Sequence, residues 1–450
     1  MRPGLSVFGL GKLGAPMLAV FAHKGFEVIG TDLNPAFVDA INDGRAPVEE
    51  PGLAGMIAAN RARIRATLDP AEAVAASDAS FIIVPTPSGP DGFFRNDYLV
   101  SALAAIGRAS RAKAGYPLVV GTSTVMPGAT GGILRETLER ASGRRVGPDL
   151  GLCYNPEFIA LGTVVRDMLN PDMILIGQSD AKAGDMLEAI YRQSVESRPD
   201  YQRMNWVNAE LCKIAVNTYV TTKISYANMI AGMCDRLPGA DADVVTHALG
   251  ADSRIGRKYI KGAIAYGGPC FPRDNKAFAA LGRSLGVRTD LAEATDAINA
   301  HQTERLVAAV AALAAPGAEV AILGLSYKPH TPVIEESQGL ALARALGARG
   351  YRLRLSDPAA LAGLPADATG ATRRCASAAE AIAGADVAVI MTPWPEYRDL
   401  PLGAPGAPAA VIDPWRMLDP AAVPAGITLL RLGAMAQDPP RAAAARKVAS

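Results

Sequence analysis

Short apolar runs alternate with longer amphipathic segments along most of the chain. The run 5–8 precedes a glycine-rich turn and a helical pattern, and a second run spans 27–31. Comparable runs follow at 81–84, 118–120, 152–154 and 173–176. Runs of this length, separated by helical segments, are typical of parallel strands covered on both faces of the sheet. The first part of the chain is therefore predicted to be a doubly wound α/β domain.

The same pattern returns from Glu319 onward. The segment 320–325 resembles the first strand and its turn, and 352–358 resembles the second strand and its acid. Between the two halves lies a helical pattern from about Asn208 to Leu237, with no Gly or Pro before Gly232. The sequence thus predicts two Rossmann-like doubly wound parallel-sheet domains joined by a long central helix. The predicted boundaries are 1–205, 206–300 for a central helical domain, 301–433, and a disordered tail at 434–450.

Composition restricts the classes of partner. A net charge of +1 over 450 residues gives no reason to expect nucleic acid or an anionic membrane. The 5 cysteines lack CxxC or CxxH spacing, which argues against a disulfide framework or a metal site and for a reducing, cytoplasmic compartment. The strand pattern begins close to Met1, so no signal peptide is expected. The most apolar window, 306–325, is broken at Pro316 and is predicted to be a helix followed by a strand.

A dinucleotide fingerprint occupies the turn after the first strand. Gly9 permits a tight turn, Gly11 leaves room for a pyrophosphate, and Gly14 allows the helix to pack closely on the strand. Asp32 follows the second strand at the spacing typical of a residue that binds the ribose hydroxyls. A carboxylate there repels a 2′-phosphate, so the predicted cofactor is NAD rather than NADP.

Polar turns follow three more of the predicted strands, at 84–87, 121–124 and 155–158. Because ligands bind outside the carboxyl ends of parallel strands, three such turns at one edge describe a site. The corresponding turn of the second domain, 324–328, lacks the glycine fingerprint. It is predicted to bind a different ligand, with Lys328 available for a phosphate.

Cys270 stands at the start of a predicted helix, after Gly267, Gly268 and Pro269. The two glycines would let the backbone approach something bulky, and Pro272 suits the first helical position. The positive end of the helix dipole favours a thiolate at Cys270. Two interpretations remain open: a nucleophilic cysteine, or a small buried hydrophobe in a turn.

The central helix carries polar residues at helical spacing. Lys213 and Asn217 are four residues apart and share a face. A solvated polar stripe explains Glu210 and Lys213 well, but it explains Asn217 less well because apolar residues surround it.

The stretches GGPCFPRD at 267–274, NPEF at 155–158 and AELCKIAVN at 209–217 together resemble the UDP-glucose/GDP-mannose dehydrogenase family. The resemblance runs from the glycine fingerprint to Arg416. It implies an NAD domain, a central helix that forms a homodimer, and a C-terminal domain that holds the sugar nucleotide. The implied activity is four-electron oxidation of a nucleotide sugar at C6 to a uronic acid with two NAD, for polysaccharide precursors. UDP-glucose is the first candidate, followed by UDP-N-acetylhexosamine and GDP-mannose.

The resemblance also assigns roles. Cys270 would capture the aldehyde as a thiohemiacetal, whose oxidation gives a thioester, and Glu157 would activate the water that hydrolyses it. The implied catalytic set is completed by Lys213, Asn217, Asp274 and Thr124. The predicted cofactor contacts are Gly9, Gly11, Lys12, Leu13, Gly14, Asp32, Pro85, Thr86, Ser123 and Thr124. The predicted substrate contacts are Glu157, Phe158, Lys213, Asn217, Arg254 (from the other subunit), Lys261, Tyr266, Gly267, Tyr327, Lys328 and Arg416.

Two positions depart from the family pattern. Leu161 stands where relatives commonly have a second glutamate, and Glu335 stands where they commonly have an arginine. These departures suggest an alternative, a sugar-nucleotide-binding paralogue with little or no turnover. A two-electron dehydrogenase of the 3-hydroxyacid type is a third possibility, but it has no use for Cys270. The NADH yield per sugar separates the three: two, none or one.

Overall fold

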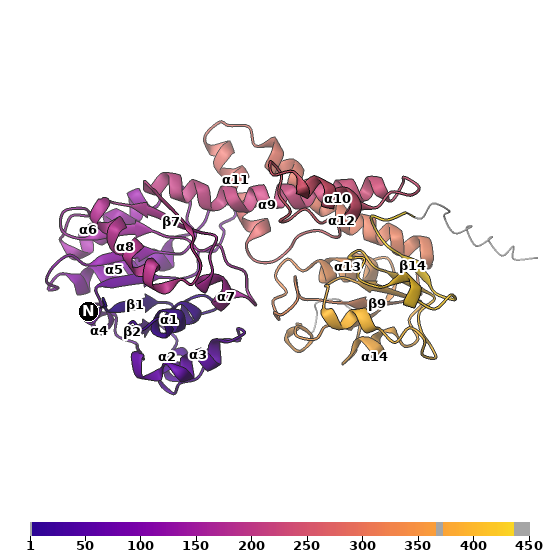
Figure 1. Cartoon of the computed structure of the whole chain (residues 1–450), viewed down its shortest axis with the longest axis horizontal. Helices are drawn as coiled ribbons and strands as arrows, with labels where there is room; N and C mark the ends of the chain where they lie inside the picture. Colours follow the sequence, from indigo (N-terminus) through magenta and orange to yellow (C-terminus); the bar gives the residue numbers. More distant parts are fainter. Residues whose placement is uncertain (1, 366–371, 436–450) are drawn as a thin grey trace, which may run out of the picture. The chain divides into compact units, whose positions relative to one another are not determined.

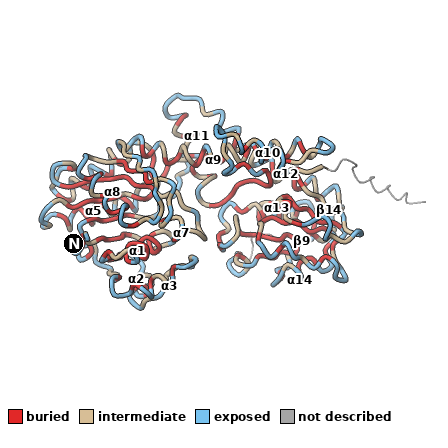
Figure 2. Tube along the Cα trace, in the orientation of Figure 1, coloured by how far each residue is buried: buried red, intermediate tan, exposed pale blue. Residues whose placement is uncertain are grey.

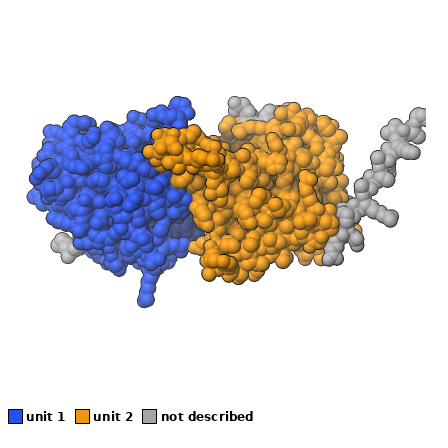
Figure 3. Space-filling view, turned by 90° about the horizontal axis from the view of Figure 1, so that it is seen from above, with its two compact units in different colours: residues 1–216 blue, residues 217–450 orange. Residues whose placement is uncertain are grey.

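The computed structural model describes residues 2–365 and 372–435 (Figure 1). The chain divides into two compact units, 1–216 and 217–450 (Figure 3). The boundary falls inside one long helix. The predicted division into three domains stays a prediction. Most of the predicted tail, from 436 on, lies outside the described residues.

The first unit contains an eight-stranded sheet of order β3-β2-β1-β4-β5-β6-β7-β8. The strands are β1 (Leu5–Phe8), β2 (Val28–Thr31), β3 (Ile64–Thr67), β4 (Ala79–Ile82), β5 (Leu118–Gly121), β6 (Gly151–Tyr154), β7 (Met173–Gln178) and β8 (Asp200–Met204). The helices are α1 (Gly14–His23), α2 (Pro35–Asn42), α3 (Leu53–Ala59), α4 (Pro70–Ala75), α5 (Asp97–Ser110), α6 (Arg135–Ser142), α7 (Val164–Leu169) and α8 (Ala181–Ser194).

Successive residues of each central strand enter opposite apolar layers. In β1, Val7 joins the cluster beneath α1, α7 and α8, whereas Phe8 joins the cluster beneath α4, α5 and α6. In β5, Val120 and Val119 divide in the same way. This two-residue period explains why the central strands are mostly apolar and buried on both faces (Figure 2).

One pair of strands differs from the predicted parallel arrangement. β7 runs antiparallel to β6, with Tyr154 opposite Gly177. The 6-residue helix α7 between them rises only about 9 Å, less than the roughly 13 Å of a four-residue strand. Its apolar side packs with α1 residues in one cluster. The chain turns back at the edge at which β6 ends, instead of crossing to the other edge.

The second unit begins within the central helix α9 (Trp206–Cys234) and adds α10 (Ala242–Ala251), α11 (Phe271–Ser284) and α12 (Asp290–Leu313). Its sheet is parallel throughout, with the order β11-β10-β9-β12-β13-β14. The strands are β9 (Glu319–Leu323), β10 (Arg352–Ser356), β11 (Thr372–Arg374), β12 (Val387–Ile390), β13 (Ala410–Ile412) and β14 (Thr428–Leu430), and the sheet helices are α13 (Gln338–Gly347) and α14 (Ala378–Ile382).

The two sheets repeat each other in topology and in hydrogen bonding. The first six strands of the first sheet have the same order as the six strands of the second. Asp78 before β4 accepts from the backbone N–H of Gly4 at 2.9 Å, and Asp386 before β12 accepts from that of Glu319 at 2.8 Å. The prediction of a second Rossmann-like domain and of the α/β fold class is confirmed. Within the described residues, no helix combines the length and the apolar character needed to cross a membrane.

Candidate active site

The glycine turn after β1 is shaped by close backbone approaches. Gly9 has φ 98°, and a Cβ there would lie 2.1 Å from the carbonyl oxygen of Ile83. A Cβ at Gly14 would lie 1.8 Å from the carbonyl oxygen of Gly9, so only glycine lets α1 start so close to the strand. A Cβ at Gly11 would meet nothing within 4 Å, which leaves open space beside the turn. The turn therefore fits a pyrophosphate at the start of α1.

Asp32 fixes this turn from the end of β2. One carboxylate oxygen accepts from the N–H of Leu10 at 2.6 Å, and the other accepts from that of Asn34 at 2.8 Å. Each oxygen can still accept a second hydrogen bond, so the carboxylate fits the ribose hydroxyls of NAD. Lys12 is exposed and Leu13 is half-buried beside it.

The turns after β4 and β5 are tied to each other. The hydroxyl of Ser123 donates to the carbonyl oxygen of Val84 at 2.7 Å and accepts from its N–H at 2.9 Å. Pro85 is exposed, Thr86 is buried and Thr124 is half-buried. The predicted cofactor residues of both turns thus lie at the carboxyl edge of the first sheet, as does the glycine turn.

The acid of the second sheet is used differently. Asp357, at the end of β10, accepts from the N–H groups of Leu325 and Ser326 at 2.7 and 2.9 Å. It also accepts from the N–H groups of Ala359 and Ala360 and from the indole N–H of Trp394. Asp357 is only 4% exposed. Its oxygens are occupied by its own loop, by the turn after β9 and by Trp394, which agrees with a ligand other than a dinucleotide on this sheet.

Glu157 and Lys213 lie together in the first unit. The ammonium of Lys213 donates to the carbonyl oxygen of Glu157 at 2.6 Å and lies 4.7 Å from the ring centroid of Phe158. The Glu157 carboxyl accepts from the phenol of Tyr191 at 3.1 Å. Burial raises the pKa of Glu157 to about 7, although Tyr191 and Lys213 act to lower it. A carboxyl with this pKa can serve as a general base near neutral pH.

The solvated polar stripe expected at Glu210 and Lys213 is wrong. Glu210 is fully buried and Lys213 is 7% exposed. Each Glu210 oxygen accepts one backbone N–H, from Gly128 at 2.6 Å and from Thr130 at 2.7 Å. The loop after β5 closes over this helix face, and helical spacing alone does not reveal such a contact. Glu210 therefore fastens to α9 the loop that carries Ser123 and Thr124.

The Gly-Gly turn before Cys270 is explained by a neighbouring loop. The N–H of Gly268 donates to the carbonyl oxygen of Glu335 at 3.0 Å. A Cβ at Gly267 would lie 2.2 Å from the carbonyl oxygen of Glu336, and one at Gly268 would lie 2.5 Å from the ring of Tyr327. The bulky groups that the two glycines allow to approach are therefore the backbone at 335–336 and the ring of Tyr327.

Cys270 is exposed and is the N-cap of α11, so the buried-hydrophobe interpretation does not hold. Helix α11 begins at Phe271, which places Pro272 at the second helical position and not at the first. All N–H groups of a first helical turn lack partners within the helix, so a proline fits there equally well. The exposed thiol stands at the positive end of a 14-residue helix.

Asp274 and Asn217 form a buried pair in the second unit. The amide of Asn217 donates to one oxygen of Asp274 at 2.6 Å, and the guanidinium of Arg273 donates to the other at 2.9 Å. The N–H of Asp274 donates to the carbonyl oxygen of Cys270 at 2.8 Å. Asp274 is therefore held one turn after the thiol, with its carboxylate fully enclosed.

Several predicted substrate residues have partners within the chain. Arg254 is exposed and pairs with Asp252, at 2.6 Å between Nη2 and Oδ2. The phenol of Tyr266 donates to Asp296 at 2.9 Å. Lys261 is exposed, and the ammonium of Lys328 lies 5.8 Å from the ring centroid of Tyr327 in the turn after β9. Their assignment to the substrate stays a prediction.

Arg416 is buried and hydrogen-bonds to several segments of the second unit. Its guanidinium forms two 2.7 Å hydrogen bonds with Asp243 of α10. Its remaining N–H groups donate to the carbonyl oxygens of Gly262, Pro414 and Leu432. All five N–H groups thus have acceptors within the chain, so a contact with a nucleotide would require one of them to be released.

The predicted site residues fall into one group in each compact unit. The first unit brings together Glu157, Phe158 and Lys213, and it carries the cofactor turns. The second unit brings together Cys270, Asp274 and Asn217, with Gly267 and Tyr327 nearby. Sequence reasoning missed Tyr191, which lies on α8 among apolar residues and carries no motif.

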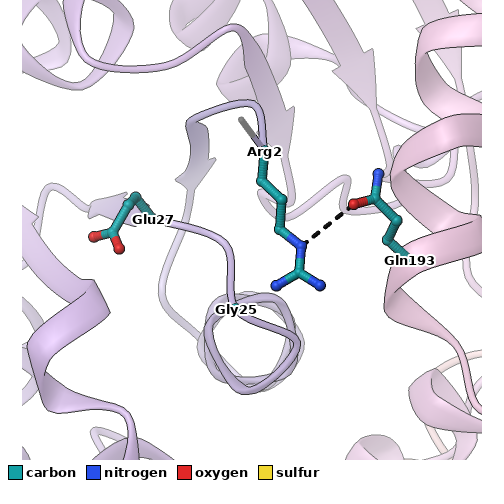
Figure 4. Close-up of a pocket in the computed structure, with 4 residues that line it drawn as sticks. All are labelled: Arg2, Gly25, Glu27 and Gln193. Atoms are coloured by element: carbon teal, nitrogen blue, oxygen red, sulfur yellow. Dashed lines mark hydrogen bonds between the residues drawn. The ribbon is translucent and has the colours of Figure 1, made fainter.

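Other surface features do not resemble this site. A hollow lined by Arg2, Gly25, Glu27 and Gln193 lies before β1 and β2, at the edge of the sheet opposite the glycine turn (Figure 4). Within residues 2–365 and 372–435, no group of three or more His, Cys, Asp or Glu is placed to hold a metal ion.

Sequence models of the UDP-glucose/GDP-mannose dehydrogenase family match most of the chain. The NAD binding domain matches residues 4–195, the central domain 207–301 and the UDP binding domain 321–420. The chain therefore belongs to this family of nucleotide-sugar oxidoreductases. The predictions of the family, of an NAD-dependent enzyme of this class and of NAD as cofactor are confirmed.

Individual relatives agree with this family. The UDP-glucose 6-dehydrogenase AglM of Haloferax volcanii is 36% identical over 400 residues, which cover 88% of this chain and 92% of the relative. The GDP-mannose 6-dehydrogenase of Pseudomonas aeruginosa is 33% identical over 78% of this chain and 80% of its own. The structure of a UDP-glucose dehydrogenase from Pyrobaculum islandicum superposes with a TM-score of 0.87 at 33% identity, covering 97% of this chain and 98% of that one.

Proposed function

We propose that this protein oxidises a nucleotide sugar at C6 to the uronic acid, with UDP-glucose as the first substrate to test. The observation that carries the proposal is Cys270, exposed at the N-cap of α11 one turn before the buried Asp274–Asn217 pair. A two-electron dehydrogenase needs no such thiol. The 36% identity with a UDP-glucose 6-dehydrogenase supports UDP-glucose over the other sugars.

The glycine turn, Asp32 and the tied turns of Val84 and Ser123 would hold NAD. NAD bound there would supply the hydride acceptor for both oxidation steps. Lys213 carries a positive charge beside Glu157, and it would stabilise the oxyanion that develops on the sugar oxygen. Asn217, one turn further along α9, donates one amide N–H to Asp274, and its second amide N–H would donate to the same sugar oxygen.

The thiolate of Cys270 adds to the aldehyde carbon and forms a thiohemiacetal. Two-electron oxidation of this adduct, with its hydride passed to the cofactor and its hydroxyl proton lost to solvent, would leave a thioester on Cys270. Water then attacks the thioester carbon, Glu157 takes a proton from that water, and cleavage of the C–S bond returns the thiolate. The α11 dipole favours the charged sulfur at the beginning and at the end of this sequence.

The role of Glu157 predicts a pH dependence. Its pKa of about 7 means that the ionised base becomes the major form only above that pH. The rate of thioester hydrolysis should therefore rise as pH increases through about 7 and level off above it. Glu157→Gln should remove this dependence together with most of the hydrolysis.

We also propose that the protein is a homodimer through its central helix and acts in a reducing, cytoplasmic compartment. Exposed apolar side chains at Tyr219, Tyr226, Met229 and Met233 recur at helical spacing along α9. A second copy would remove this stripe from water. None of the five cysteines forms a disulfide, which agrees with a reducing compartment. Sedimentation of the full chain and of Tyr219→Glu with Tyr226→Glu would test the dimer, since the double variant should be monomeric.

The alternative is a sugar-nucleotide-binding paralogue with little turnover. It is favoured by Leu161, which packs against the apolar core of the first unit where relatives commonly carry a charge. A panel of UDP-glucose, UDP-N-acetylhexosamines and GDP-mannose, each assayed for NADH formation, separates the possibilities. Binding of a sugar nucleotide without NADH formation from any of them would support the paralogue.

A further inference from the structure

A buried polar network surrounds the carboxyl of Glu157. The phenolic oxygen of Tyr191 lies 3.1 Å from Oε1 of Glu157 and 2.5 Å from Oδ1 of Asn155. The amide nitrogen of Asn155 donates to the carbonyl oxygen of Leu175 at 2.8 Å, which fixes its oxygen toward the phenol. Tyr191 is 5% exposed and Asn155 is 2% exposed, so water does not compete freely for these groups.

The phenol has one proton for two acceptors. When Glu157 is ionised, the phenol donates its proton in a hydrogen bond to the carboxylate, because hydrogen bonds to charged groups are stronger than neutral ones. When Glu157 is protonated, its own O–H can donate to the phenolic oxygen, and the phenol then donates to Asn155. Glu157 keeps a hydrogen bond with the phenol in both protonation states, whereas Oδ1 of Asn155 receives the phenolic proton only when Glu157 is protonated.

The charged and titratable neighbours come from three other elements. Lys213 of α9 faces Glu157, and Tyr201 of β8 acts on Tyr191. Tyr191 of α8 touches Glu157 directly. Burial raises the pKa of Tyr191 well above its usual value, so the phenol remains a neutral donor through the pH range of interest.

We propose that Tyr191 is a positioning residue that sets the protonation equilibrium of Glu157, and that Asn155 opposes it by competing for the same phenolic proton. The inference rests on the proposed function only where it links this equilibrium to catalysis. Tyr191 itself does not touch the reacting atoms. Its phenol favours the ionised form of Glu157 and donates to one carboxylate oxygen of Glu157, which leaves the other carboxylate oxygen to bind water.

The two neighbours should shift the pKa of Glu157 in opposite directions. Tyr191→Phe removes the donor to the carboxylate, so the pKa should rise by about one unit. Asn155→Ala removes the competing acceptor, so the phenol donates to Glu157 alone and the pKa should fall. General damage to the fold would not give opposite signs.

The test is a carbon-13 NMR titration of the full-length protein labelled at the glutamate carboxyl carbon, without substrate. Glu157→Gln identifies the Glu157 signal by its absence. Tyr116→Phe is the matched control, because Tyr116 also donates to a carboxylate, that of Asp180 at 2.7 Å, but it precedes β5 at the opposite edge of the sheet. This control should leave the Glu157 titration unchanged.

A higher pKa of Glu157 in Tyr191→Phe together with a lower pKa of Glu157 in Asn155→Ala supports the proposal. An unchanged titration in Tyr191→Phe, or shifts of the same sign in both variants, overturns it. If Tyr191→Phe does not fold, the direction of the shift in Asn155→Ala decides alone. The pH profile of uronate formation is measured in parallel: an acid limb that survives in Glu157→Gln refutes Glu157 as the base, whatever the titration shows.

Discussion

Replacing Glu210 should release the loop that follows β5. In Glu210→Ala the backbone N–H groups of Gly128 and Thr130 lose the carboxylate that accepts them at 2.6 and 2.7 Å. A hydrogen bond to a charged group contributes about 1.5–3 kcal/mol, and a buried donor left without a partner costs about 1–3 kcal/mol. Gly128 is exposed and can bind water instead, whereas Thr130 is buried. We therefore expect a local loss of about 3 kcal/mol.

Hydrogen exchange of the segment 122–134, followed by mass spectrometry of the full chain, measures this loss directly. Since about 1.4 kcal/mol corresponds to a factor of ten, protection of the loop amides should fall about a hundredfold. Glu210→Gln keeps one acceptor oxygen, so protection of the loop amides should fall only about tenfold. NAD should also bind more weakly, because Ser123 and Thr124 lie on this loop.

Glu136→Ala, which removes an exposed carboxylate from the first turn of α6, is the matched control and should leave the exchange unchanged. Protection in Glu210→Ala equal to that of the unmodified protein would refute the idea that this buried carboxylate holds the loop. Loss of protection over the whole chain would refute a local effect.

Three further substitutions test the site. Cys270→Ser should abolish net uronate formation while NAD and sugar nucleotide still bind, because an alkoxide does not form easily at neutral pH. The control Cys212→Ser should retain activity. Four-electron turnover by Cys270→Ser would contradict the covalent mechanism. Asp32→Ala should weaken NAD binding about tenfold or more and relax the discrimination against NADP, so an unchanged ratio of the two affinities would exclude the glycine turn as the cofactor site. Glu335→Arg should give no gain in NAD affinity in a titration, and a large gain would favour the binding paralogue.

The local sequence was sufficient to predict the glycine turn and the alternating layers. Gly9 and Gly14 are required because a Cβ at either position would lie less than 3 Å from a carbonyl oxygen, and such requirements are local enough to leave a motif. The two-residue period of β1 and β5 follows from strand geometry alone. The second Rossmann-like domain was predictable because the pattern of the first half returns from Glu319 onward.

Residues whose role depends on tertiary contacts were misread or missed. Glu210 and Lys213 have a helical spacing that suits a solvated face, but the loop at 128–130 and the turn at 157–158 bury them. Tyr191 occupies a helical position that suits the core, and only its distance from Glu157 reveals its polar role. The antiparallel direction of β7 was missed because apolar patterning does not encode strand direction.

The most direct test of the central claim is the NADH yield from a limiting amount of UDP-glucose. The full-length protein is incubated with excess NAD at a pH above the pKa of Glu157, and NADH is compared with the uronic acid formed. Two molecules of NADH for each sugar, with no aldehyde released, are expected from a relay through Cys270. A yield of one would indicate a simple alcohol dehydrogenase, and no NADH from any nucleotide sugar would contradict the proposed activity.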